Sequence, residues 1–176
     1  MKKQLNTLAL LSVICGAAIS TANAADGTIN FTGEIIDAAC TVSPATANQT
    51  VNLGQVSASA FSTVGSTAAP TAFQIDLTSC PASVTTASVK FDGTPYATGD
   101  NITLGLSPVP GAATGVGVRI RSATNLVIPL YTATTPVALT QGNTNTLNFN
   151  AAYVSRASTV TAGPANAVAT FSVIYN

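Results

Sequence analysis

The chain has 176 residues, of which 47% are hydrophobic and only 7% are charged, and six basic residues balance six acidic ones. It contains no histidine, which excludes a Ser-His-Asp or Cys-His nucleophile, and no basic patch, so nucleic acid is not an expected partner. With so little charge, small polar residues must cover much of the surface. Such a surface suits a protein that packs against copies of itself.

Residues 1–24 have the pattern of a secretory signal peptide. Two lysines precede a mostly apolar run over residues 8–19, and Ala22 and Ala24 provide the small residues that precede cleavage. No stretch approaches the roughly 20 apolar residues that cross a bilayer, so membrane insertion is not expected. We therefore predict an exported chain that begins at residue 25.

The exported chain keeps two cysteines, Cys40 and Cys80. An oxidising compartment favours a disulfide between them, which would stabilise the fold by roughly 4 kcal/mol through loop closure. The alternative is a pair of buried free thiols. Two cysteines without histidine also argue against a zinc site, and no metal or cofactor is expected.

Strand signals dominate the rest of the chain, as β-branched and aromatic residues alternate with small polar ones. The clearest segments are 73–77, 89–91, 116–121 and 147–153, and shorter candidates are 50–56, 101–106 and 126–130. Arg119 and Arg121 are expected on one solvated strand face. Turns are predicted at 108–111, 141–143 and 162–164, and a loop at 57–69. No window has a helical period, so the pattern predicts a single all-β sandwich.

The first exported segment alternates strictly. One face of it carries Gly27, Ile29, Phe31, Gly33 and Ile35, and the other face carries polar residues. The segment is either an ordinary first strand of the sandwich or a strand that serves another molecule.

The last segment is a second alternating strand, with Ala169, Phe171, Val173 and Tyr175 on one face. If it borders a gap, its unpaired backbone invites another strand. The N-terminal segment of a second molecule has a suitable length, and burying Ile29, Phe31 and Ile35 would contribute roughly 1.5–3 kcal/mol each. Such a head-to-tail contact generates filaments.

These segments resemble the subunits of chaperone–usher pili, particularly the type 1 fimbrial group, over nearly all of the exported chain. The resemblance rests on sequence pieces in a fixed order: 27–35, 38–42, 51–56, the strand 73–77 before Cys80, 145–153, Gly163 and Tyr175. The family implies an incomplete immunoglobulin-like β-sandwich that lacks its last strand. A periplasmic chaperone lends a strand first, and the next subunit's N-terminal extension replaces it at an outer-membrane usher.

The resemblance also assigns roles. It implies a donor extension over residues 25–36, with Gly27, Ile29, Phe31, Gly33 and Ile35 entering successive pockets, and a pilin domain over 37–176. A groove edge is implied for the last strand, at Ala169, Phe171, Val173 and Tyr175, with the carboxylate of Asn176 held by the chaperone. The expected function is a structural subunit of a surface fimbria that supports adhesion, most simply the shaft subunit. Only two residues precede Gly27, so a minor adaptor subunit remains open.

Two other classes of function were considered. Asp92 and Asp100 could form a glycosidase pair, but both lie beside glycine in expected loops, where Asp is a common turn former. A sugar-binding module would need an exposed aromatic residue. The chain has no Trp, and only Tyr96 is a reasonable candidate, although a packed loop residue is the simpler interpretation.

Overall fold

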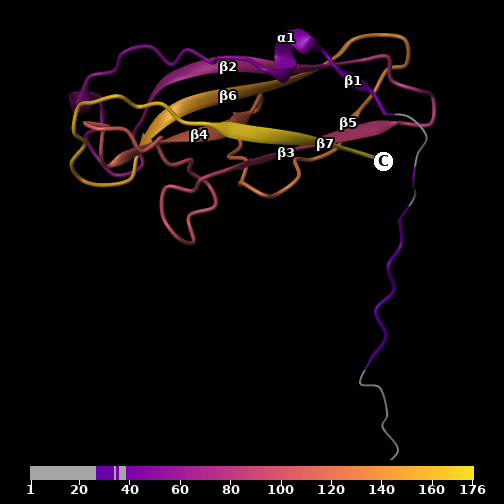
Figure 1. Cartoon of the computed structure of the whole chain (residues 1–176), viewed down its shortest axis with the longest axis horizontal. Coiled ribbons are helices and arrows are strands. Elements are labelled where there is room, and N and C mark those ends of the chain that lie inside the picture. Colours follow the sequence, from indigo (N-terminus) through magenta and orange to yellow (C-terminus); the bar gives the residue numbers. More distant parts are fainter. Residues whose placement is uncertain (1–26, 34, 36–38) are drawn as a thin grey trace, which may run out of the picture. The chain divides into compact units, whose positions relative to one another are not determined.

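The computed structural model describes residues 27–33, 35 and 39–176 (Figure 1). The chain divides into two units, Met1–Ile35 and Ile36–Asn176. The predicted signal peptide lies outside the described residues. All the strands and helices described below belong to the second unit.

The larger of two antiparallel sheets has four strands in the order β1-β2-β6-β4. These strands are β1 (Thr41–Val42), β2 (Thr67–Thr78), β6 (Asn145–Ser155) and β4 (Val116–Ser122). The central pair, β2 and β6, keeps an unbroken register from Thr71↔Ala151 to Leu77↔Asn145. This pair forms the centre of the larger sheet.

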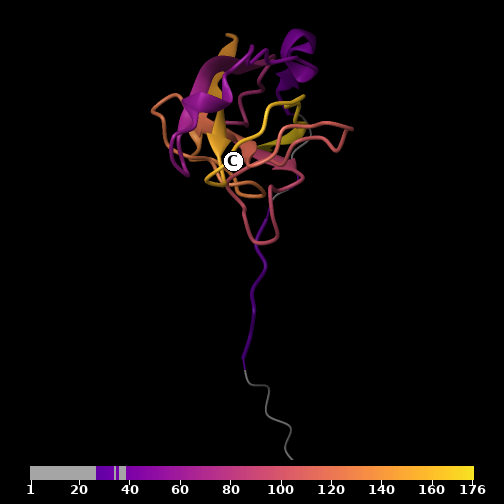
Figure 2. The same cartoon turned by 90° about the vertical axis from the view of Figure 1, so that its left-hand side faces the viewer.

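The smaller sheet has three strands in the order β5-β3-β7. They are β5 (Val137–Ala138), β3 (Thr86–Gly93) and β7 (Ala169–Tyr175). Figure 2 shows β2 and β6 on one side of the second unit and the yellow strand β7 on the other. The prediction of an all-β sandwich is confirmed.

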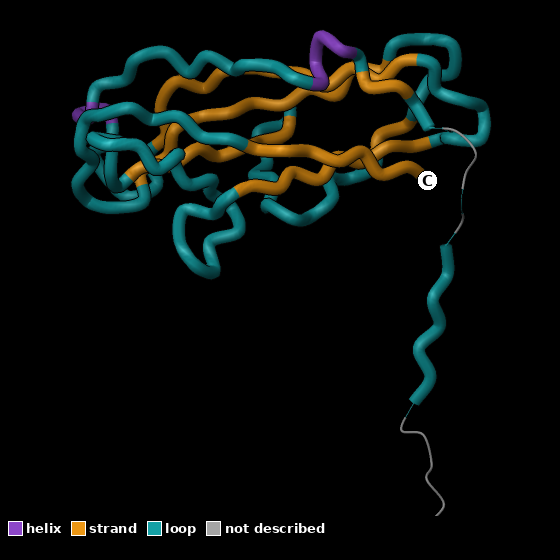
Figure 3. The backbone as a smooth tube through the Cα atoms, viewed as in Figure 1, coloured by secondary structure: helices purple, strands orange, loops and turns teal. Residues whose placement is uncertain are grey.

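Two helical turns and long loops complete this unit (Figure 3). The turns are α1 (Pro44–Ala47) and the 3-10 turn η1 (Ala58–Ala60). Within the part of the chain that the structure describes, no helix is long and apolar enough to cross a membrane.

Alternating side chains of both sheets form one core. Phe91 of β3 meets Phe149 of β6 edge-to-face at a ring-centroid distance of 5.1 Å, and Phe73 stacks on Phe149 at 5.4 Å. Ile75, Leu77, Val84 and Val89 are buried around these rings. Burying each of these side chains stabilises the fold by roughly 1.5–3 kcal/mol.

Cys40 and Cys80 form the predicted disulfide. The two cysteines lie next to a short antiparallel pair, in which Thr41 of β1 faces Thr78 of β2. The disulfide therefore fastens β1, the outer strand of the larger sheet, to the end of β2.

The four clearest predicted strands are present, whereas the three shorter candidates were wrong. Residues 101–106 and 126–130 make only isolated bridges, at Leu104 and Val127, and residues 50–56 belong to no strand. The predicted loop 57–69 is also too long, because β2 begins at Thr67. The short strands β1 and β5 and the two helical turns were missed, since two to four residues carry no readable period.

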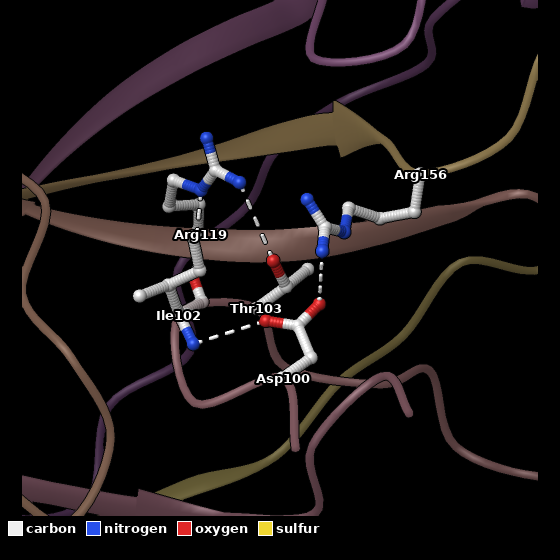
Figure 4. Close-up of polar contacts among 5 residues, drawn as sticks. All are labelled: Asp100, Ile102, Thr103, Arg119 and Arg156. Atoms are coloured by element: carbon white, nitrogen blue, oxygen red, sulfur yellow. Dashed lines mark hydrogen bonds and ion pairs between the residues drawn. The ribbon is translucent and has the colours of Figure 1, made fainter. Parts of the chain in front are cut away.

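The prediction that Arg119 lies on a solvated face was wrong. Arg119 is buried beneath the loop that contains Ile102 and Thr103, and its guanidinium donates to both residues at 3.4 Å (Figure 4). This loop reaches β4 because Leu104 exchanges two backbone hydrogen bonds with Val118. Burial lowers the pKa of Arg119, and nearby Arg156 and Arg121 lower it further.

The two carboxylates considered for catalysis have structural partners. Asp92 lies in β3, not in a loop as predicted, and it pairs with Lys90 at 3.3 Å. Asp100 lies in a loop, where one carboxylate oxygen accepts from the amide of Ile102 and the other pairs with Arg156 at 2.7 Å (Figure 4). Asp100 thereby anchors its loop to the end of β6.

Candidate functional site: a groove beside the last strand

Strand β7 is an edge strand. It pairs with β3 from Gly93↔Ala169 to Ala87↔Tyr175, and among the described residues no backbone hydrogen bond reaches its other edge. Phe171, Val173 and Tyr175 point inward and are half-buried, whereas the intervening residues are exposed. An edge of this kind can pair with a further strand.

Residues 50–56 face the same gap. Val51 and Leu53 pack against the core and their neighbours are exposed, so the segment alternates as a strand does. Its backbone makes one hydrogen bond to a described residue, from the Gly54 amide to the Asn52 side chain. The segment therefore alternates as a strand does, but no described strand pairs with it.

A groove of about 790 Å³ lies between these two unpaired backbones. Its floor is formed by core-facing side chains of the larger sheet, including Phe73, Ile75 and Ala151, and its rims by residues 47–54 and 165–169 with Phe171. Among the residues that the structure describes, no charged one lines the groove. A strand with one apolar face would cover this surface.

A second hollow of about 390 Å³ adjoins the first. It is lined by Val56, Phe61, Val116 and the segment 160–166, and the two hollows share Gly54, Tyr153, Ala165 and Asn166. The groove therefore continues past the first residue of β7.

Two tyrosines cross the space between the sheets. The Tyr153 hydroxyl of β6 donates to the Ala165 carbonyl at 3.0 Å, and the Tyr175 hydroxyl of β7 donates to the Cys40 carbonyl at 3.2 Å. Burial raises the pKa of both phenols above the ordinary value of 10.0. Both side chains were expected on apolar strand faces, and both pack against the core.

We expect the raised pKa values to make the fold less stable in strong alkali. The unfolded chain would ionise both tyrosines near pH 10, before the folded chain does, so the free energy of unfolding should fall as the pH rises above about 10. Denaturant unfolding at pH 8 and pH 11 measures the loss. A Tyr153→Phe/Tyr175→Phe variant should show a smaller loss; an equal loss in both proteins would contradict the assignment.

The predicted groove-edge residues fall in two groups. Ala169 and Phe171 line the open groove, whereas Val173 and Tyr175 do not. The opposite wall at 47–54 was not predicted from the sequence, although residues 51–56 are among the pieces that carry the family resemblance. Tyr96, the candidate for sugar stacking, is half-buried.

The predicted donor residues have no strand structure of their own. Residues 27–33 and 35 are in no helix or strand, and the side chains of Ile29, Phe31 and Ile35 are 79%, 91% and 98% exposed. Such exposed apolar side chains are typical of a segment that binds elsewhere.

An incomplete β-sandwich with an open, apolar, strand-sized groove defines a class of strand-accepting proteins. The chain belongs to the fimbrial protein family, whose model matches residues 29–176. It is therefore a structural subunit of a surface fimbria.

The chain is similar in sequence to known fimbrial proteins over nearly their full length. The chain is 39% identical to long polar fimbria protein A of Salmonella typhimurium, with 99% of this chain and 97% of the relative covered. It is 40% identical to the type-1 fimbrial protein A chain of Escherichia coli K12, with 97% and 94% covered.

Solved structures share the fold. The P pilus rod subunit PapA matches with a TM-score of 0.66 at 24% identity, over 79% of this chain and 100% of that one. A type I fimbria protein of Burkholderia pseudomallei matches with a TM-score of 0.60 at 38% identity, over 85% and 97%. The fold is thus an immunoglobulin-like sandwich that lacks a strand.

Proposed function

We propose that this chain is a shaft subunit that polymerises by donor-strand exchange. Residues 25–36 of one subunit, released from the signal peptide, enter the groove beside β7 of the next. The observation that carries the proposal is the pair of unpaired backbones, β7 and residues 50–56, on the two sides of one apolar groove.

The direction of the inserted strand follows from the fold. Immunoglobulin-like sheets are antiparallel, so the missing strand should run antiparallel to β7. Phe31 is the largest apolar residue of the donor segment, and the aromatic floor of the groove lies beside Phe171. Pairing Phe31 with Phe171 brings Ile29 to Val173 and Gly33 to Ala169.

Gly33 then lies at the level of the groove that the Leu104 side chain enters. At the level of Ala169 the paired residue of β3 is Gly93, where a Cβ atom would lie 2.5 Å from the Leu104 side chain. Leu104 is 3% exposed and fills the interior at this level. An inward residue of the donor strand has little room here, which explains a glycine.

A Gly33→Val variant should form fibres about ten-fold less efficiently or worse, because overpacking costs roughly 1–3 kcal/mol. The yield of polymer in sheared surface material measures the effect. Thr32→Val adds an apolar side chain to the outward face and serves as the matched control. Normal fibre yield from Gly33→Val would exclude this position for Gly33.

The groove also needs a cover before the donor strand arrives, since an open apolar edge invites aggregation. We include in the proposal export through the periplasm, capping by a periplasmic chaperone and assembly at an outer-membrane usher. Asn176 remains the expected contact for basic residues of the chaperone. Within the subunit its backbone oxygen accepts from the amides of Thr85 and Thr86 at 3.1 and 3.0 Å.

A further inference from the structure

Tyr175 lies on β7 beyond the last residue of that strand that lines the open groove. The open hollow is lined along β7 as far as Phe171, and four residues later the Tyr175 hydroxyl donates to the Cys40 carbonyl. Tyr175 belongs to the smaller sheet, whereas Cys40 adjoins β1 at the outer edge of the larger sheet. The phenol therefore bridges the two sheets beside the open edge of β7.

Both ends of this bridge are fixed. Cys40 is buried and is held by its disulfide to Cys80. On the other side, Asn176 donates to the Thr86 carbonyl at 3.1 Å and accepts from Thr85 and Thr86. The position of the Tyr175 ring is consequently fixed by its own strand on one side and by the hydrogen bond to the Cys40 carbonyl on the other.

No contact with the described residues of its own subunit accounts for Gly27 of the donor segment. A Cβ atom added to it would meet nothing within 4 Å among the described residues. It is nevertheless on the same face as Ile29, Phe31 and Ile35, where every other residue except Gly33 is large and apolar. A crowded partner surface would account for a glycine at this position.

We propose that Tyr175 is the residue that sets the register of the inserted strand, with Gly27 of the neighbouring copy lying against its ring. The inference rests on the proposed donor-strand exchange and adds to it a wall, the Tyr175 ring, at one end of the groove. Gly27 lies four residues before Phe31, and Tyr175 lies four residues after Phe171. Antiparallel pairing of the two phenylalanines thus brings the glycine to the tyrosine.

The wall gives the groove a way to select its strand. A strand with a larger inward residue at position 27 must either displace the Tyr175 ring from Cys40 or slip by two residues, since a slip of one would turn its apolar face outward. A slip of two away from Tyr175 would move Phe31 to Ala169 and bring Ile29 to Phe171. The register with glycine against Tyr175 is the one that fills the groove.

The test is a pair of compensating substitutions in the full-length exported chain, co-expressed with a chaperone and an usher. Gly27→Val should slow fibre growth about ten- to a hundred-fold, which is the range expected for overpacking. Combining it with Tyr175→Val, which shortens the wall but keeps a strand-forming residue, should restore growth to within a few-fold of that of Tyr175→Val alone. Thr28→Val, on the outward face, is the matched control and should grow normally.

The Tyr175→Phe variant distinguishes the role of the ring from that of its hydrogen bond, because it keeps the ring and removes the hydroxyl. It retains the wall, so Gly27→Val should stay defective when combined with it. If the Tyr175→Val subunit fails to fold, as judged by loss of the oxidised Cys40–Cys80 form, Tyr175→Leu takes its place. Normal growth of Gly27→Val, or a defect that neither Tyr175→Val nor Tyr175→Leu relieves, would overturn the role of Tyr175. Wild-type chains that form no strand-exchanged polymer would instead overturn the proposed function.

Discussion

A Phe31→Asp subunit is expected to be exported and oxidised normally but not to join a fibre. Burial of Phe31 should contribute roughly 1.5–3 kcal/mol, which corresponds to a factor of about 10 to 150 in the equilibrium between free and inserted strand. A carboxylate in a groove without a charged residue adds a large desolvation cost. Electron microscopy of cells that express the variant should show no fibres.

The matched control is Asn30→Asp, which adds the same charge one residue earlier, on the outward face of the donor strand. This variant should polymerise nearly as well as the wild type. Chaperone capture should persist in both variants, because the groove of each subunit is unchanged, and co-purification with the chaperone measures it. A Phe31→Asp subunit that loses chaperone capture would show that Phe31 belongs to the core of its own subunit.

Replacement of both cysteines, Cys40→Ser/Cys80→Ser, is expected to cost roughly 4 kcal/mol of the free energy of unfolding. The disulfide closes a loop of about 40 residues and also holds the Cys40 carbonyl that accepts from Tyr175. Denaturant unfolding of the chaperone-released subunit measures the difference. Reduced wild-type protein is the matched control and should unfold at a similar denaturant concentration.

A loss below about 1 kcal/mol in the double variant would contradict the expected role of the disulfide. Such a result would place the stability of this end of the sandwich in the hydrogen bonds of Tyr175 and Asn176. The Tyr175→Phe variant would then become the more damaging change.

The strong strands could be predicted because their side chains alternate and each pairs with a long strand of the same chain. Segment 50–56 shows where this reasoning stops. Its residues alternate as in a strand and pack as in a strand, yet no described backbone pairs with it. The sequence pattern correctly predicted the alternation of the side chains but not the absence of backbone pairing. Under our proposal, the strand that pairs with this segment is supplied by another molecule.

Arg119 was misplaced for a related reason. Alternation along β4 correctly assigns it to the face opposite Val118 and Ile120, but the covering loop around Thr103 comes from a distant part of the chain. A period of two predicts which face a residue takes and not what covers that face. For the same reason, residues 47–54 were not predicted to form the second wall of the groove.

The most direct test of donor-strand exchange is a gel of sheared surface material, run unheated and boiled, from cells with a chaperone and an usher. Full-length chain should give a ladder of multiples that collapses to one band on boiling, and a chain that lacks residues 25–36 should give none. A full-length chain that runs as a stable single subunit without a chaperone would contradict the account, since the groove would then be filled from within.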